Sequence, residues 1–181
     1  MNAIAAQLTS DDIAGLAAHF AAQPGAQSGA RSSLLPGMAS ARVAFPEGHR
    51  ETFVRYHAVN FPARKQVHHF YANRTALQAA RAGKPLPDGS ELLVEVHAVR
   101  LDFDDKPMMG KDGLLEAEDL LGYSVMAREA GWGADIPDML RNDNWNYAAF
   151  TADRKPRTIN QAECLACHKP LERSSFAFTL K

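Results

Sequence analysis

The chain has 181 residues, of which 46% are apolar and 23% charged, so it can bury a core and still carry a soluble surface. A formal net charge of −1 gives no reason to expect a nucleic acid or an anionic membrane as a partner. No apolar run approaches the roughly 18 residues of a transmembrane helix, and the 2 cysteines are too few for a disulfide framework.

The first 22 residues predict an amphipathic helix. Polar residues at 9–12 supply an N-cap with acids in the first turn. Apolar side chains then recur at helical spacing, at Ile13, Leu16, Ala17 and Phe20. Residues 23–40 are rich in Gly, Ser, Ala and Pro and predict a linker. The N-terminus has neither the basic start nor the long apolar stretch of a signal peptide.

From about residue 41 the pattern changes to short strands. Alternating apolar and polar residues predict strands at 53–59, 66–71, 91–99, 121–126 and 145–150. Asn73 caps a predicted helix over 74–82, which Gly83 ends, and a turn at 86–90 and a loop at 103–113 follow. We therefore expect residues 41–181 to form an α+β domain, a mainly antiparallel β-sheet with a few short helices.

Both cysteines lie in one short motif near the C-terminus, Cys164-Leu165-Ala166-Cys167-His168. Cys-x-x-Cys-His is the attachment signal of haem c. One helical turn sets two thiols along a porphyrin edge, where they bond its vinyl carbons, and the next residue lies under the iron. A thioredoxin-like pair would open a helix within a βαβ unit, which is missing here, and a structural zinc site would need a fourth ligand. The motif predicts one covalent haem c per chain, attached by Cys164 and Cys167, with His168 as axial iron ligand.

This order, strands first and haem attachment segment last, resembles the cytochrome P460 family and its relatives, the beta-type cytochromes c′. The resemblance covers about residues 45–181 and rests on Phe70-Tyr71-Ala72-Asn73, Asp88-Gly89, Asp143-Asn144-Trp145-Asn146-Tyr147 and residues 161–169. It implies a homodimeric, mostly antiparallel β protein with one haem per chain and an open sixth iron position. Members of the family handle small nitrogen species: cytochrome P460 oxidises hydroxylamine, and the c′-like members bind nitric oxide.

One departure from the family pattern bears on the chemistry. In the hydroxylamine-oxidising members, a lysine in the strand after the Asp-Gly turn bonds covalently to a haem carbon. An ungapped reading from Tyr71 through Asp88-Gly89 puts Val94 at that position, and its neighbours Leu92, Leu93 and Val96 are not lysine either. Valine cannot form the bond, so the resemblance predicts a haem without a lysine cross-link.

The resemblance also suggests which residues line the open side of the haem. Adjacent histidines on the strand 66–71 must face opposite ways. His68 falls where cross-linked members place a polar distal residue, so it is a stronger candidate than His69 for hydrogen-bonding an iron-bound ligand or closing the site itself. Phe70 is a candidate apolar distal cap, as are Phe53, Phe61 and Phe103, although each of these side chains also suits a core.

Other candidates have weaker support. Trp145 and Tyr147 are expected to pack beside the haem or a dimer interface, and Trp132 to lie in a loop. Glu95 and Glu129 would relay protons only if they lay near the haem, and carboxylates on strands are usually solvated.

Residues 1–22 resemble the C-terminal end of a class I cytochrome c domain, with Met1 where the distal methionine ligand belongs. The alternative is an ordinary N-terminal helix. The resemblance predicts a redox partner cytochrome, fused upstream in a longer natural chain. Because haem c is normally attached outside the bacterial cytoplasm, we expect a periplasmic protein whose targeting segment is not part of this chain.

Three functions remain open from the sequence. The first is a protein that binds a small gaseous or nitrogenous ligand, nitric oxide above all, at an open iron position. The second is an enzyme that oxidises hydroxylamine despite Val94, through a lysine or tyrosine from another segment. The third is a six-coordinate electron carrier, which needs a second protein ligand such as His68, Met108, Met109 or Met126.

Overall fold

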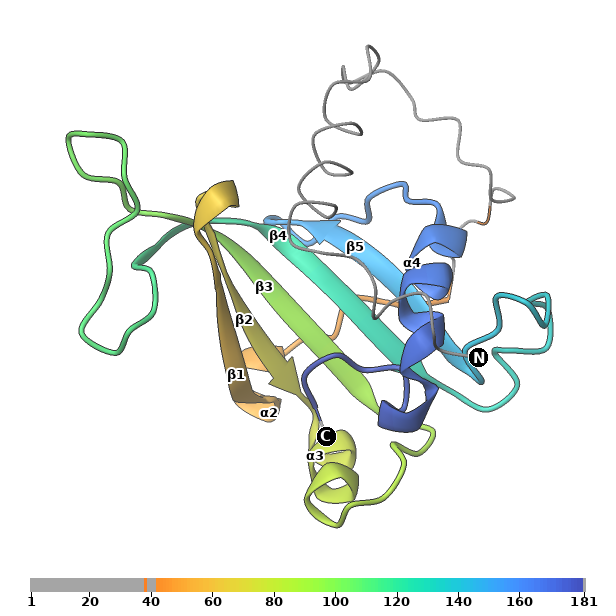
Figure 1. Cartoon of the computed structure of the whole chain (residues 1–181). Coiled ribbons are helices and arrows are strands. Elements are labelled where there is room, and N and C mark those ends of the chain that lie inside the picture. The colour runs from red at the N-terminus through yellow and green to blue at the C-terminus, as the bar shows by residue number, and fades with distance from the viewer. Residues whose placement is uncertain (1–37, 39–41, 181) are drawn as a thin grey trace, which may run out of the picture. The chain divides into compact units, whose positions relative to one another are not determined.

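The computed structural model describes residue 38 and residues 42–180. These residues form one five-stranded antiparallel sheet with strand order β1-β2-β3-β4-β5, so that each strand pairs with its neighbour in sequence (Figure 1). The strands are β1 (Val54–Phe61), β2 (Gln66–Ala72), β3 (Glu91–Val99), β4 (Ala117–Arg128) and β5 (Trp145–Thr151).

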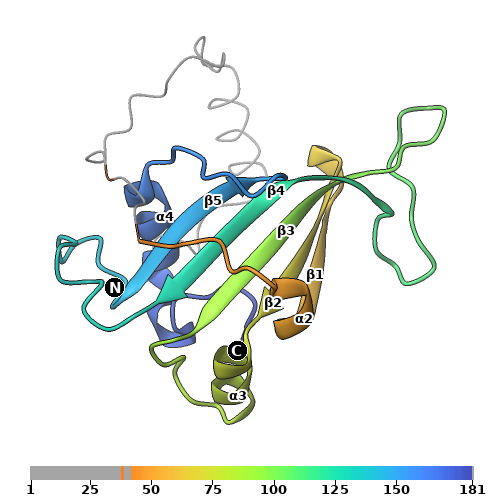
Figure 2. The ribbon, with the colours of Figure 1, turned by 180° about the vertical axis from the view of Figure 1, so that it is seen from behind.

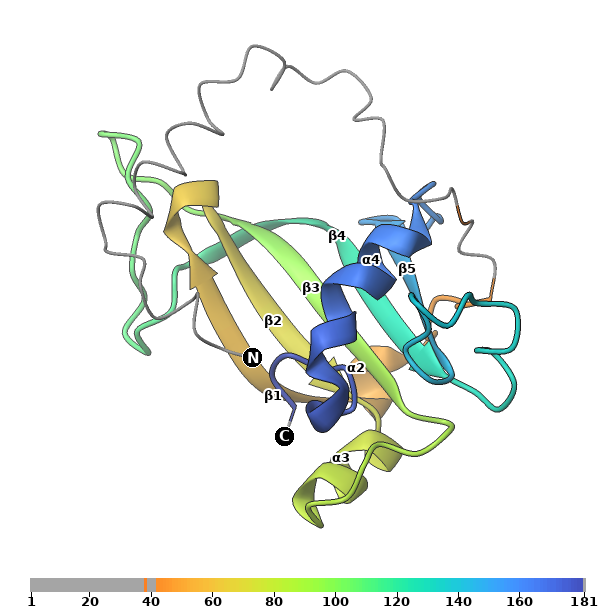
Figure 3. The ribbon, with the colours of Figure 1, turned by 45° about the vertical axis from the view of Figure 1, so that its right-hand side comes forward.

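Short helices join and cover the strands. They are α2 (His49–Thr52), the 3₁₀ helix η1 (Pro62–Arg64), α3 (Arg74–Arg81), α4 (Gln161–His168) and the 3₁₀ helix η2 (Lys169–Ser174). Helix α4 and the C-terminal segment lie over one face of the sheet (Figure 3). Helix α2 and the chain leading into it lie over the opposite face (Figure 2).

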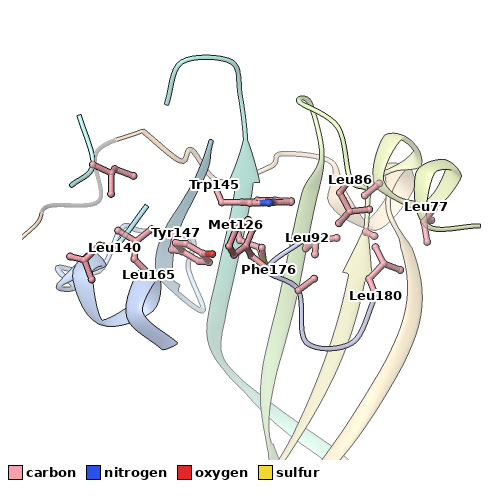
Figure 4. Close-up of a cluster of buried hydrophobic side chains, with 14 of the residues drawn as sticks. Leu77, Leu86, Leu92, Met126, Leu140, Trp145, Tyr147, Leu165, Phe176 and Leu180 are labelled. Carbon is pink, nitrogen blue, oxygen red and sulfur yellow. The ribbon is translucent and has the colours of Figure 1, made fainter. Parts of the chain in front are cut away.

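The alternation of side chains along the strands divides the buried residues between these two faces. On the α4 face, Leu92, Met126 and Tyr147 come from three paired strands and pack with Leu165 of α4 (Figure 4). On the α2 face, neighbouring residues of the same strands, including Leu93 and Val125, pack in a second cluster. The central strands β3 and β4 therefore each contribute side chains to two separate hydrophobic cores.

The predicted α+β architecture with a mainly antiparallel sheet is confirmed. The predicted strands correspond to β1 to β5, with β3 as predicted and the other four strands shifted at one or both ends. The predicted helix at 74–82 is α3, whose N-cap Asn73 accepts a hydrogen bond from the Ala76 amide at 3.0 Å. The short helix α2 was not predicted, because four residues are too few for a periodic pattern. The expected helix over 1–22 and nearly all of the 23–40 linker lie outside the described residues.

Among the helices of the described part, none is long and apolar enough to cross a membrane.

Gly122 of β4 should be intolerant of a side chain. Its φ is +151°, and a Cβ there would meet the Phe150 carbonyl oxygen of β5 at 2.5 Å. We expect Gly122→Ala to lower the free energy of unfolding by about 3 kcal/mol or more, because it combines backbone strain with a backbone clash. Gly89, with φ +83° and nothing within 4 Å, is the control. Gly89→Ala should cost only about 1 kcal/mol. Equal losses for the two variants in urea unfolding would contradict the clash.

Candidate functional site

A cavity of about 440 Å³ lies between α4 with the C-terminal segment and the sheet face beneath them. Its volume falls within the range of sites for small molecules and cofactors. Its walls are mostly apolar, and the motif residues Cys164, Cys167 and His168 all line it. The cavity and the motif therefore form a single site.

Helix α4 brings the three motif residues to the cavity by its periodicity. Positions i, i+3 and i+4 of a helix share one face, so the spacing of the motif aims all three side chains the same way. Asn160 begins the helix by accepting a hydrogen bond from the Ala162 amide at 3.2 Å. Ala162 and Leu165 are both fully buried and anchor the helix to the core. Cys164 is half-buried and Cys167 is exposed at the edge of the cavity.

The His168 imidazole is held in one orientation. Its Nδ1 lies 2.6 Å from the Phe176 carbonyl oxygen, which can only accept, so Nδ1 carries the proton and donates. Nε2 is then left with its lone pair, as a metal-ligating imidazole requires. The rings of Tyr147 and Phe178 flank the imidazole at centroid distances of 4.7 and 4.8 Å. Burial lowers the pKa of His168, which favours the neutral ring.

A buried amide ties α4 to the sheet beside this histidine. Asn142 is completely buried and donates to the Tyr147 hydroxyl at 3.0 Å and to the Leu165 carbonyl at 2.9 Å. Burial raises the pKa of Tyr147, so its hydroxyl stays protonated. The network thus joins the loop before β5, the strand itself and the middle of α4.

The sheet supplies the opposite wall of the cavity. Phe70 of β2, Val94 of β3 and Ser124 of β4 are paired in register and all line it. Leu92 and Met126 line it next to them. The described residues that line the cavity include no lysine. Val94, which the family resemblance aligned with the cross-linking lysine, is one of the lining residues.

His68 and His69 face opposite sides of the sheet, as predicted from their adjacency. His68 has the same parity as Phe70 but lies outside the cavity lining, with its ring 4.3 Å from that of Phe61 and its Nε2 3.2 Å from the Gln66 side-chain oxygen. His69 lies on the α2 face, where its ring is 5.1 Å from that of His97.

Of the four candidate phenylalanine caps, only Phe70 lines the cavity. Phe53 packs with the cluster on the α2 face, and Phe103 is 97% exposed on the loop after β3. Of the three candidate methionines, Met126 lines the cavity, whereas Met108 and Met109 are exposed on that same loop.

Of the remaining candidates, too, some line the cavity and others lie elsewhere in the fold. Tyr147 lines the cavity, and Trp145 is fully buried in the neighbouring core. Glu95 has the opposite parity to Val94 and points to the α2 face, away from the cavity. Trp132 lies in a loop, as predicted.

Sequence reasoning missed several residues at the mouth of the cavity. Tyr56 of β1 lines it, and its hydroxyl lies 2.9 Å from that of Thr179 in the C-terminal segment. Burial raises the pKa of Tyr56. The strand alternation could not reveal Tyr56, because the β1–β2 register shifts between Arg55 and His57. Phe178 and Thr179 follow no periodic element, so only the fold shows their position.

The residues present fit a covalently held haem. Two thiols and one imidazole share a helix face over a cavity with few polar groups, and the imidazole nitrogen that would bind iron is the one left without a proton. The apolar walls suit the body of a porphyrin.

Asn142 offers a test of how α4 is held. We expect Asn142→Ala to lower the free energy of unfolding by about 2–3 kcal/mol, because the variant removes two buried hydrogen bonds. Asn144 is the control, because its side chain makes two long contacts, donating to Asp88 and accepting from the Gly133 amide, each at 3.3 Å, and touches α4 in neither. Asn144→Ala should cost about 1 kcal/mol or less. Urea unfolding of both variants measures the difference, and an Asn142→Ala protein as stable as the wild type would contradict the role given to this amide.

A family model described as cytochrome P460 matches residues 46–179, which include the whole sheet and the motif on α4. No curated protein matches the sequence.

Proposed function

Since the chain belongs to the cytochrome P460 family, we propose that it is a mono-haem c-type cytochrome that binds a small ligand, nitric oxide, at an open iron position. Cys164 and Cys167 would hold the haem through thioethers, and the His168 imidazole would bind its iron. The observation that carries the proposal is that these three side chains line one apolar cavity. In addition, His168 Nδ1 donates a hydrogen bond to the Phe176 carbonyl, which leaves Nε2 free of a proton. When bound, the haem supplies an iron with a coordination position for a small diatomic molecule.

The sheet wall that faces the motif supports ligand binding rather than acid–base chemistry, and the carboxylate of the described lining, Glu163, is exposed on α4. Phe70 and Val94 are apolar, and the Tyr56 hydroxyl is engaged with Thr179. Ser124 is the polar side chain among the paired residues of this wall, and a neutral hydroxyl is a poor proton acceptor at neutral pH. Such walls exclude water and offer a small uncharged ligand an apolar surrounding.

The absence of lysine from the described cavity lining supports a haem without a lysine cross-link. Lys65 is half-buried, paired with Asp105 and outside the cavity lining. Tyr56 and Tyr147 do line the cavity, so hydroxylamine oxidation through a tyrosine cross-link is the alternative that a chemical test must address.

A second candidate function, the six-coordinate electron carrier, is favoured by the position of Met126 in the cavity lining. A thioether is a known second axial ligand of haem c. Against it, Met126 pairs in register with Tyr147, whose ring packs against that of His168, and a second iron ligand would have to come from the side opposite His168.

Family membership also supports a homodimer in the periplasm that exchanges electrons with a redox partner cytochrome. These remain proposals that rest on the family, together with the resemblance of residues 1–22 to the end of a class I cytochrome c.

Ligand titration distinguishes the two candidate functions. We expect the ferrous protein to bind one nitric oxide per chain, with a clear change in the Soret band, because Phe70 and Val94 on the wall facing the motif offer iron no donor atom. Met126→Leu should leave the spectrum of the ferrous protein unchanged. A ferrous protein that is six-coordinate, refuses nitric oxide and becomes five-coordinate in Met126→Leu would establish the electron carrier instead.

Peptide mapping tests the attachment. After trypsin digestion, we expect haem on a single peptide, residues 158–173, since Lys169 is followed by Pro170 and resists cleavage. Replacing both Cys164 and Cys167 by serine should release haem into acidified solvent, whereas Cys167→Ser alone should keep one thioether. A second peptide joined to the haem, carrying Tyr56 or Tyr147, would reveal a cross-link and favour the oxidase.

A further inference from the structure

The face of the sheet opposite the haem cavity carries an unusual group of polar side chains. His69 of β2 and Glu95 of β3 are directly paired across the two strands, and His97 follows Glu95 on the same face. One nitrogen of each histidine and one oxygen of the carboxylate all lie within 4.8 Å of one another. From this arrangement we propose that His69, Glu95 and His97 form a second metal site, for a divalent transition metal such as zinc, with a water molecule as the fourth ligand.

The geometry follows from the sheet itself. Residues i and i+2 of a strand share a face, and a paired residue on the next strand stands about 5 Å away, so three such positions make a triangle of ligands on rigid backbone. Ligand atoms bound tetrahedrally at about 2.1 Å lie about 3.4 Å apart. His97 Nε2 and the Glu95 Oε2 oxygen are already 3.4 Å apart. Only the His69 ring has to move closer, by side-chain rotation.

The ligand chemistry suits zinc and related ions. Two imidazoles and one carboxylate are donors that zinc, iron and copper accept. Burial lowers the pKa of His69, so its ring is neutral and has a lone pair to offer. Burial raises the pKa of Glu95, but hydrogen bonds from His97, Tyr71 and His49 outweigh it and hold that pKa at about 2. The carboxylate is therefore ionised. His97 would release its Nε2 proton on binding the metal, whereas the contacts of Tyr71 and His49 with Glu95 would remain.

Surrounding side chains hydrogen-bond to Glu95 in the way that groups around a metal site hydrogen-bond to a metal-binding carboxylate. The Tyr71 hydroxyl donates to Oε2 at 3.0 Å, and His49 Nε2, itself completely buried, lies 3.3 Å from Oε1. Such contacts orient a ligand before the metal arrives. In His97, by contrast, one ring nitrogen is not hydrogen-bonded: Nδ1 is buried and has no partner among the described residues.

Other charges face the cluster and set its net potential. The Arg50 guanidinium lies 3.6 Å from Glu95 Oε1, on the side away from His97, and its side chain is 62% exposed. Arg55 and Asp112 act on His69 with opposite signs. The Glu95 oxygen that faces His97 is the one contacted by Tyr71 and not by Arg50, so it is the oxygen that the metal would take.

The inference is independent of the haem chemistry, because the two sites lie on opposite faces of one sheet. It is tested by isothermal titration of zinc sulfate into the haem-loaded protein after treatment with a chelator. We expect one zinc ion per chain, and we expect His69→Ala and His97→Ala each to weaken binding by more than about tenfold, since even outer partners of a metal ligand contribute that much. His57→Ala, which removes an exposed histidine of β1, should bind zinc as the wild type does.

The haem spectrum and the thermal unfolding of each variant show whether it is folded. If His69→Ala does not fold, His69→Gln takes its place in the titration. Wild-type protein that takes up no zinc, or variants at His69 and His97 that bind it as tightly as the wild type, would overturn the proposal. Zinc uptake that persists in these variants but disappears when Cys164 and Cys167 are replaced would assign the binding to unreacted thiols, and so would count against haem attachment as well.

Discussion

The hydrogen bond from His168 Nδ1 to the Phe176 carbonyl is the interaction on which the site depends. It requires the chain to turn back sharply after η2, and two non-glycine residues, Ser175 and Phe176, adopt positive φ values of 53° and 61° to do so. Such residues cost about 1–3 kcal/mol each. The buried side chains of Phe176, Ala177 and Leu180 and the hydrogen bonds of this turn offset that cost. The strained turn is what fixes the imidazole and presents Nε2.

The same turn also completes the cavity. Once the chain has reversed, Phe178 packs against the His168 ring and Thr179 reaches Tyr56 of the edge strand. The last residues of the described chain therefore hold both the His168 imidazole and the opposite wall of the cavity. Asn142, by joining Tyr147 to the Leu165 carbonyl, fixes the other side of α4. The site is rigid because α4 is held from two sides by buried polar contacts.

One sheet serves two chemically different faces. Phe70 and Val94 face an apolar cavity, and their neighbours His69 and Glu95 face a polar cluster on the other side. A single layer of backbone separates the two environments, because successive side chains of a strand point in opposite directions. A change of one residue in register would exchange the two sets of residues, so the pairing of β2 with β3 determines where each chemistry lies.

Local signals in the sequence were sufficient to predict the sheet, the helix after Asn73 and the motif on α4, because spacing and capping depend on residues only a few positions apart. They also predicted that His68 and His69 face apart. They could not choose Phe70 over Phe53 or Phe103, nor find Tyr56 and Thr179, because those positions depend on a register shift in β1 and on a turn formed by distant contacts. The residue types of the site were thus determined by the sequence alone. Their convergence on one cavity was decided only when strand pairing brought separated segments together. The same holds on the opposite face for the cluster of His69, Glu95 and His97.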